Sequence, residues 1–61
     1  MRYRVDFVRL ILGVPFTIAS IDIRRARNLE RALRAAELRF SRMHGLTTWR
    51  ERADKAEIEV A

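Results

Sequence analysis

The sequence predicts an α+β fold in the order strand, strand, helix, strand, with one helix packed on one face of a three-stranded antiparallel sheet. Two observations predict it. Apolar residues alternate with polar ones in three segments, and between the second and third of these the apolar period lengthens to three and four residues. The chain has 61 residues, enough for a single small domain over residues 1–61 and too few for a multidomain enzyme.

Two strands joined by a tight turn are expected first. Residues 2–12 alternate and are rich in β-branched and aromatic types, and residues 16–24 continue in the same manner. Between them, residues 13–15 combine a glycine with a proline, which fixes φ and has no backbone N–H to donate. We therefore predict a hairpin with a three-residue turn, in which Leu12 lies opposite Phe16.

A helix is expected over residues 28–44. Asn28 is placed to cap its first turn, and Gly45 to adopt the left-handed conformation that ends it. The apolar residues of this segment recur at spacings of three and four, so they fall within about 80° of arc on one helix face. They are Leu29, Ala32, Leu33, Ala36, Phe40 and Met43.

The last residues predict a short helical turn and a third strand. Thr48 and Glu51 have the spacing of a capping box, which indicates a turn over residues 49–53. Residues 56–60 alternate without interruption, so their apolar side chains face the helix. Placing this strand beside the first gives the order 2-1-3 and brings its two glutamates opposite the first strand's arginines. This architecture resembles half of a ferredoxin-like split β-α-β unit, a resemblance that implies no function.

In the predicted register the apolar side of the hairpin changes halfway along both strands. Phe7 lies opposite Ile21 toward the helix, whereas four apolar residues nearer the turn point to the other face. We expect a second copy of the chain to cover these four, which makes them candidate self-association residues: Leu10, Leu12, Phe16 and Ile18. Two alternatives remain, a β-bulge near Arg9 or Ala19 that returns the outer half to the core, and a hairpin tip that dips into a membrane surface.

Composition also favours a homodimer. A chain of this length buries little apolar surface relative to its ordering cost, so it usually needs a disulfide, a metal or a partner. The sequence has no cysteine and a single histidine, His44, which predicts neither a disulfide nor a metal site.

The formal net charge is +5, and twelve of the thirteen basic residues are arginine, a bias that codon usage in a GC-rich genome also produces. A positive excess attracts phosphates and acidic proteins, although an arginine-rich helix face is also compatible with simple solvation. No aromatic residue is free to stack on single-stranded bases beside these arginines. The candidate phosphate contacts are Arg24, Arg25, Arg27, Arg31 and Arg34.

The sequence predicts no catalytic residue, metal or cofactor. His44 has no second histidine or cysteine to share a metal, and neither Ser20 nor Ser41 has a histidine at a spacing that would activate it. Glu57 and Glu59 lie on one strand face, where pairing with arginines accounts for them better than acid–base chemistry. A ribbon-helix-helix repressor needs two consecutive helices after one short strand, an order that this chain does not follow.

We therefore expect a small non-enzymatic protein-interaction module that self-associates through the hairpin, with an acidic protein as a further partner. A basic nucleic-acid-binding accessory protein is the alternative. The apolar stretch over residues 8–21 is interrupted by Arg9 and Pro15 and is too short to span a bilayer as a helix. We accordingly expect no integral membrane segment and a cytoplasmic location.

Overall fold

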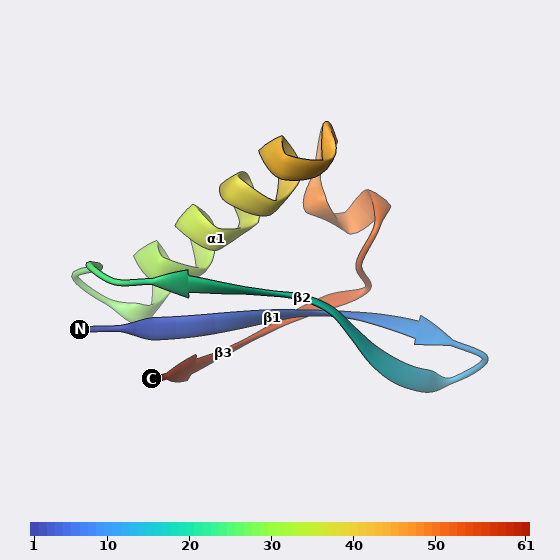
Figure 1. Cartoon of the computed structure of the whole chain (residues 1–61), viewed down its shortest axis with the longest axis horizontal. Helices are drawn as coiled ribbons and strands as arrows, with labels where there is room; N and C mark the ends of the chain where they lie inside the picture. The colour runs from blue at the N-terminus through green and yellow to red at the C-terminus, as the bar shows by residue number, and fades with distance from the viewer.

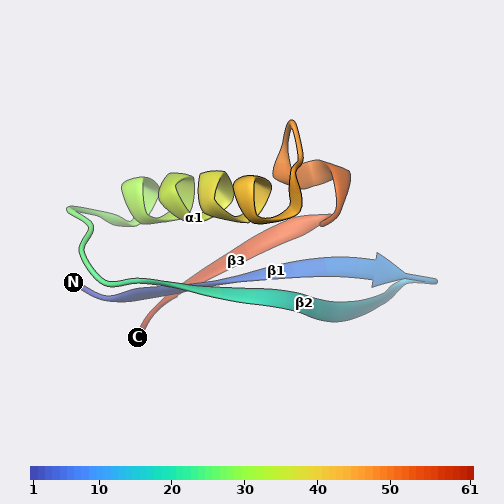
Figure 2. The same cartoon turned by 45° about the horizontal axis from the view of Figure 1, so that its top comes forward.

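Three antiparallel strands form one sheet in the order β2-β1-β3, and a single α-helix packs on one of its faces (Figures 1 and 2). This confirms the predicted fold class and strand order. The computed structural model describes residues 1–61, and its elements are β1 (Tyr3–Ile11), β2 (Val14–Ile23), α1 (Leu29–His44), the short 3-10 helix η1 (Trp49–Glu51) and β3 (Lys55–Val60).

The hairpin turn differs from the predicted one. Its two central residues are Leu12 and Gly13, with φ angles of 52° and 80°. Positive φ at both positions is the requirement of a type I′ turn, whose twist matches that of the flanking strands. The predicted three-residue turn is therefore wrong, since β2 already begins at Val14. Pro15 lies within β2, where its missing N–H is tolerated because β2 is an edge strand.

A β-bulge interrupts the pairing of β1 with β2. Phe7 lies opposite Ala19, but the next residue, Val8, lies opposite Thr17, so Ile18 is an extra residue on β2. The predicted register is wrong, because it pairs Phe7 with Ile21, which lies two residues beyond the observed partner Ala19. The bulge expected as an alternative near Ala19 is present.

Stacked aromatic rings join α1 to the sheet. Phe7 of β1 and Phe40 of α1 are fully buried, with ring centroids 4.2 Å apart and planes 10° from parallel. Trp49 of η1 meets Phe7 edge-on at 5.7 Å, so η1 closes one end of the core. The core comprises Tyr3, Val5, Phe7, Ile21, Ile23, Ala32, Ala36, Phe40 and Ala53.

The buried side of α1 is shorter than predicted. Leu29 and Met43, at the two ends of the expected apolar stripe, are exposed. The three-stranded part of the sheet spans residues 3–8 of β1, about 20 Å, whereas the 16 residues of α1 span about 24 Å. The first and last turns of the helix therefore have less sheet beneath them.

Both ends of α1 are capped as predicted. The Asn28 side chain accepts a hydrogen bond from the backbone N–H of Arg31 at 2.9 Å. At the other end Gly45 has a φ of 65°, and the backbone N–H of Leu46 donates to the carbonyl of Ser41 at 2.8 Å. The expected capping box between Thr48 and Glu51 is also present.

Replacing Asn28 by alanine removes the cap acceptor, so we expect the free energy of unfolding to fall by about 1 kcal/mol. The measurement is urea unfolding followed by the fluorescence of Trp49. Asn28→Asp keeps an acceptor oxygen and serves as the control, with stability near that of the parent. An alanine variant with an unchanged unfolding midpoint would show that this cap contributes nothing.

Candidate interaction surfaces

The outer half of the hairpin extends beyond the rest of the molecule (Figure 1). β3 pairs with β1 only as far as Val8, so the residues nearer the turn form a ribbon of two strands. We call residues 9–18 the hairpin arm. A two-stranded ribbon in water is marginal by itself, so additional contacts would stabilise it.

The hairpin arm exposes large apolar side chains and carries little charge. Leu12, at its tip, is 99% exposed, and residues 10–21 contain no charged side chain. All four candidate self-association residues are exposed. Ile11 and Val14, which flank the type I′ turn, are exposed as well, although the predicted register did not include them. The exposed apolar side chains of the arm are Leu10, Ile11, Leu12, Val14, Phe16 and Ile18.

These side chains do not share one face, contrary to expectation. Phe16 lies opposite Arg9, and Leu10 lies opposite Pro15. Residues directly opposite each other share a face while successive residues alternate, so Leu10 and Phe16 point to different sides of the ribbon. The physical reason is the extra residue Ile18, because it moves the side chains of β2 nearer the turn to the opposite face of the ribbon. The bulge does not return these side chains to the core, since all of them remain exposed.

Asp54 occupies the outer edge of β1 next to the arm. Its backbone N–H donates to the carbonyl of Val8 at 2.8 Å, and its carboxylate accepts from the backbone N–H of Leu10 at 2.6 Å. This side chain takes the position at which β3 would otherwise continue, and it blocks addition of another strand there. A partner therefore meets the arm through its side chains rather than through this edge.

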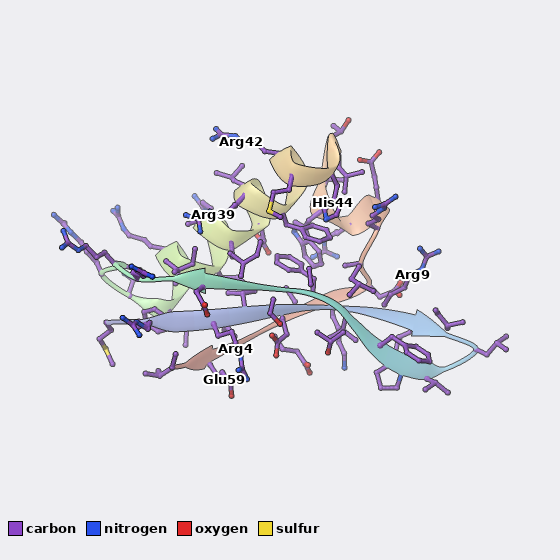
Figure 3. All side chains as sticks on the ribbon, viewed as in Figure 1. Arg4, Arg9, Arg39, Arg42, His44 and Glu59 are labelled. Carbon is purple, nitrogen blue, oxygen red and sulfur yellow. The ribbon has the colours of Figure 1, made fainter.

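A second surface, at the opposite end of the molecule, is rich in arginine. We call the five candidate phosphate contacts the arginine surface; three lie in the connection between β2 and α1 and two in α1. All five are exposed, and none has a carboxylate within 4.0 Å. The only arginine in an ion pair is Arg4, which contacts Asp6 at 3.7 Å and also contacts Glu59 (Figure 3).

The sheet pairing separates the charges of the two faces. Residues 24–44 contain seven arginines and two glutamates, a balance of +5 that equals the net charge of the whole chain. Carboxylates gather instead on the open face of the sheet, where Asp6 lies opposite Glu57, and Arg4 lies between Asp22 and Glu59. Charge along the sequence could not reveal this separation, because these carboxylates come from three strands.

The arginines of α1 differ in their contacts. Arg39 reaches back to the sheet, where its Nη1 donates to the carbonyl of Asp22 at 3.2 Å. Arg42 points away from the sheet (Figure 3). Arg31 and Arg34 line a shallow depression on the outer side of α1 beside Leu38. The outer side of the helix therefore presents guanidinium groups that are free to bind an anion.

The remaining polar candidates have structural partners. The His44 ring packs against Phe40 with centroids 4.6 Å apart, and its Nδ1 lies 3.2 Å from Nη1 of Arg52. The hydroxyl of Ser20 donates to Asp6 at 2.6 Å. No group of three His, Cys, Asp or Glu side chains is arranged to hold a metal ion.

Comparison of the chain with known protein families, curated proteins and solved structures finds no match. No helix in the structure combines the length and the apolar character needed to cross a lipid bilayer.

Proposed function

We propose that this chain is a small non-enzymatic interaction module that self-associates through the hairpin arm. The observation that carries the proposal is the exposure of six large apolar side chains on a ribbon that extends beyond the core. Contiguous exposed apolar surface on a small protein marks a contact with another molecule.

Charge supports a second copy of the chain as the partner. The charge-free residues 10–21 lie at one end of a molecule whose longest dimension is 35 Å, and the arginine surface lies at the other (Figure 1). That separation is several times the Debye length of about 8 Å at physiological salt. Two copies can therefore meet through their arms with little repulsion. The arm itself carries one cation, Arg9 at its base, so an acidic partner would find little charge there to bind.

The area of the arm fits a homodimer. Leu12 is almost wholly exposed and the other five apolar side chains are between 41% and 51% exposed, which offers on the order of 600 Å² of apolar surface. A standard protein–protein interface buries about 800 Å² on each partner. These side chains are divided between the two faces of the ribbon, so a partner copy has to enclose both faces of the arm to bury them all.

The conformation of Leu12 supports the same conclusion. Its φ of 52° lies in the left-handed region, which costs an ordinary L-residue about 1–2 kcal/mol and which asparagine or glycine adopts more readily. Its side chain is not buried by its own chain. A residue that is unfavourable for its own turn and makes no internal contact is expected where a partner supplies the contact.

Light scattering at several protein concentrations tests the proposal. We expect the molar mass to rise with concentration from 7.2 kDa toward twice that value. Association worth about 4 kcal/mol already half-populates a dimer at about 1 mM. A mass of one chain at every concentration up to that limit would overturn the proposal.

A further inference from the structure

The outer side of α1 faces away from the sheet (Figure 2). At the carboxyl end of the helix, Leu38 and Ser41 border the segment of Thr47 and Trp49 that leads into η1. Arg31, Arg34 and Arg42 follow spacings of three and eight residues, which keep them on this outer side. From the first to the last, the row extends about 16 Å along the helix axis. Arg24, Arg25 and Arg27 lie in the connection that precedes α1.

We propose that this side of α1 docks in the major groove of double-stranded DNA and that its arginines bind the phosphates flanking the groove. A guanidinium group carries five donors in a planar fork, which matches the geometry of phosphate oxygens. These guanidinium groups have no carboxylate partner within 4.0 Å, so phosphate binding breaks no ion pair.

Dimensions favour DNA over double-stranded RNA. An α-helix with its side chains is about 10–12 Å wide, and the major groove of B-form DNA is about 12 Å wide. The major groove of A-form RNA is deep and narrow and does not admit a helix. The arginines of α1 can reach groove phosphates only if the helix itself enters the groove, so B-form DNA is the duplex that suits this surface.

The same surface is unsuited to a membrane. A helix that lies on a bilayer needs a broad apolar side directed at the lipid, but the apolar side of α1 is buried against the sheet. On its outer side Leu38, at 55% exposed, is the one large apolar side chain among the arginines. Phosphates presented by a groove therefore fit better than a lipid surface.

Recognition by this helix would depend little on base sequence. Between its arginines the outer side carries Ala35 and Leu38. Glu30 and Asn28 border the same depression, but the Asn28 side chain is used to cap the helix, so no side-chain amide is free to read adenine. Phosphate contacts then dominate, and the affinity falls with salt in proportion to their number. Each phosphate contact contributes about −0.9 to the slope of log K against log salt concentration.

Fluorescence anisotropy of a labelled duplex of about two helical turns, roughly 20 base pairs, tests this inference across a range of salt concentrations. The decisive variant is R31Q/R34Q, which removes two guanidinium groups from the outer side of α1. We expect the salt slope to lose about 1.8 and the binding at low salt to weaken by at least tenfold. The matched control is R50Q/R52Q, which removes the same charge from η1 and from the residue that follows it.

A loss of salt slope in R31Q/R34Q, with the parent slope kept in R50Q/R52Q, supports docking through α1. An unchanged slope in R31Q/R34Q would overturn the inference. Equal weakening of both variants would show general charge attraction and would overturn the inference, as would the absence of binding to DNA at low salt. Binding as tight to a duplex RNA of equal length, or to vesicles of anionic lipid, would overturn the groove geometry. Because the arginine surface is remote from the hairpin arm, DNA binding by a protein that stays monomeric would refute self-association alone.

Discussion

Phe40→Ala is expected to remove about half or more of the free energy of unfolding of this domain. Truncating a fully buried phenylalanine costs about 3–5 kcal/mol, because it removes apolar burial and leaves a cavity. Stability of about 0.05–0.15 kcal/mol per residue gives a domain of 61 residues only about 3–9 kcal/mol in total. Here the ring lies 4.2 Å from Phe7, which itself packs on Trp49, so the loss exposes a connected aromatic cluster.

Far-UV circular dichroism and urea unfolding measure this effect. Phe40→Leu retains most of the side-chain volume, so we expect it to stay folded with a loss of about 1–1.5 kcal/mol. Leu38→Ala truncates a half-exposed side chain on the opposite side of α1 and should change stability by less than about 1 kcal/mol. An alanine variant at position 40 with the parent midpoint would contradict the role assigned to the aromatic stack.

The importance of Phe40 was predictable from the sequence because helical periodicity is a local signal. Ala32, Ala36 and Phe40 repeat every four residues, and each is fully buried. The same locality explains why both caps of the helix and the capping box at Thr48 were predicted correctly. The opposite charges of β1 and β3 indicated their pairing, and the contact of Arg4 with Glu59 confirms it. The expectation for Glu57 was wrong, because Glu57 lies opposite Asp6 and its charge is paired with Lys55 of its own strand at 3.6 Å.

The turn was mispredicted because intrinsic preferences and strand twist disagree there. Glycine and proline at positions 13 and 15 indicate a turn, whereas leucine is a poor residue for the first central position of a type I′ turn. The twist of the paired strands selects the two-residue turn at Leu12 and Gly13 nevertheless.

The position of the bulge depends on tertiary packing, so it could not be predicted from a single sequence. Ile18 and Ala19 are both compatible with a strand, so the pattern does not say which is extra. In the structure Ala19 lies opposite Phe7 and packs against the core, whereas Ile18 is exposed. The apolar character of the hairpin arm was thus predictable, while the division of its side chains between two faces was not.

Leu12→Asn is expected to stabilise the monomer while weakening self-association, two effects of opposite sign from one substitution. An Asn-Gly pair is the most favourable sequence for a type I′ turn, so the free energy of unfolding of the monomer should rise by about 1 kcal/mol. Burial of a leucine side chain contributes about 1.5–3 kcal/mol. A symmetric dimer contains the residue twice, so the dissociation constant should increase by about 100-fold or more.

The two effects are measured separately. Light scattering gives the dissociation constant, and urea unfolding at dilutions where both proteins are monomeric gives the stability of the single chain. Met43→Asn makes a similar apolar-to-amide change at an exposed position outside both surfaces and should leave association unchanged. If Leu12→Asn lowered both quantities, the side chain would be supporting its own hairpin. If association were unaffected, the tip of the arm would lie outside the contact, and the dimer would have to form through the sides of the ribbon.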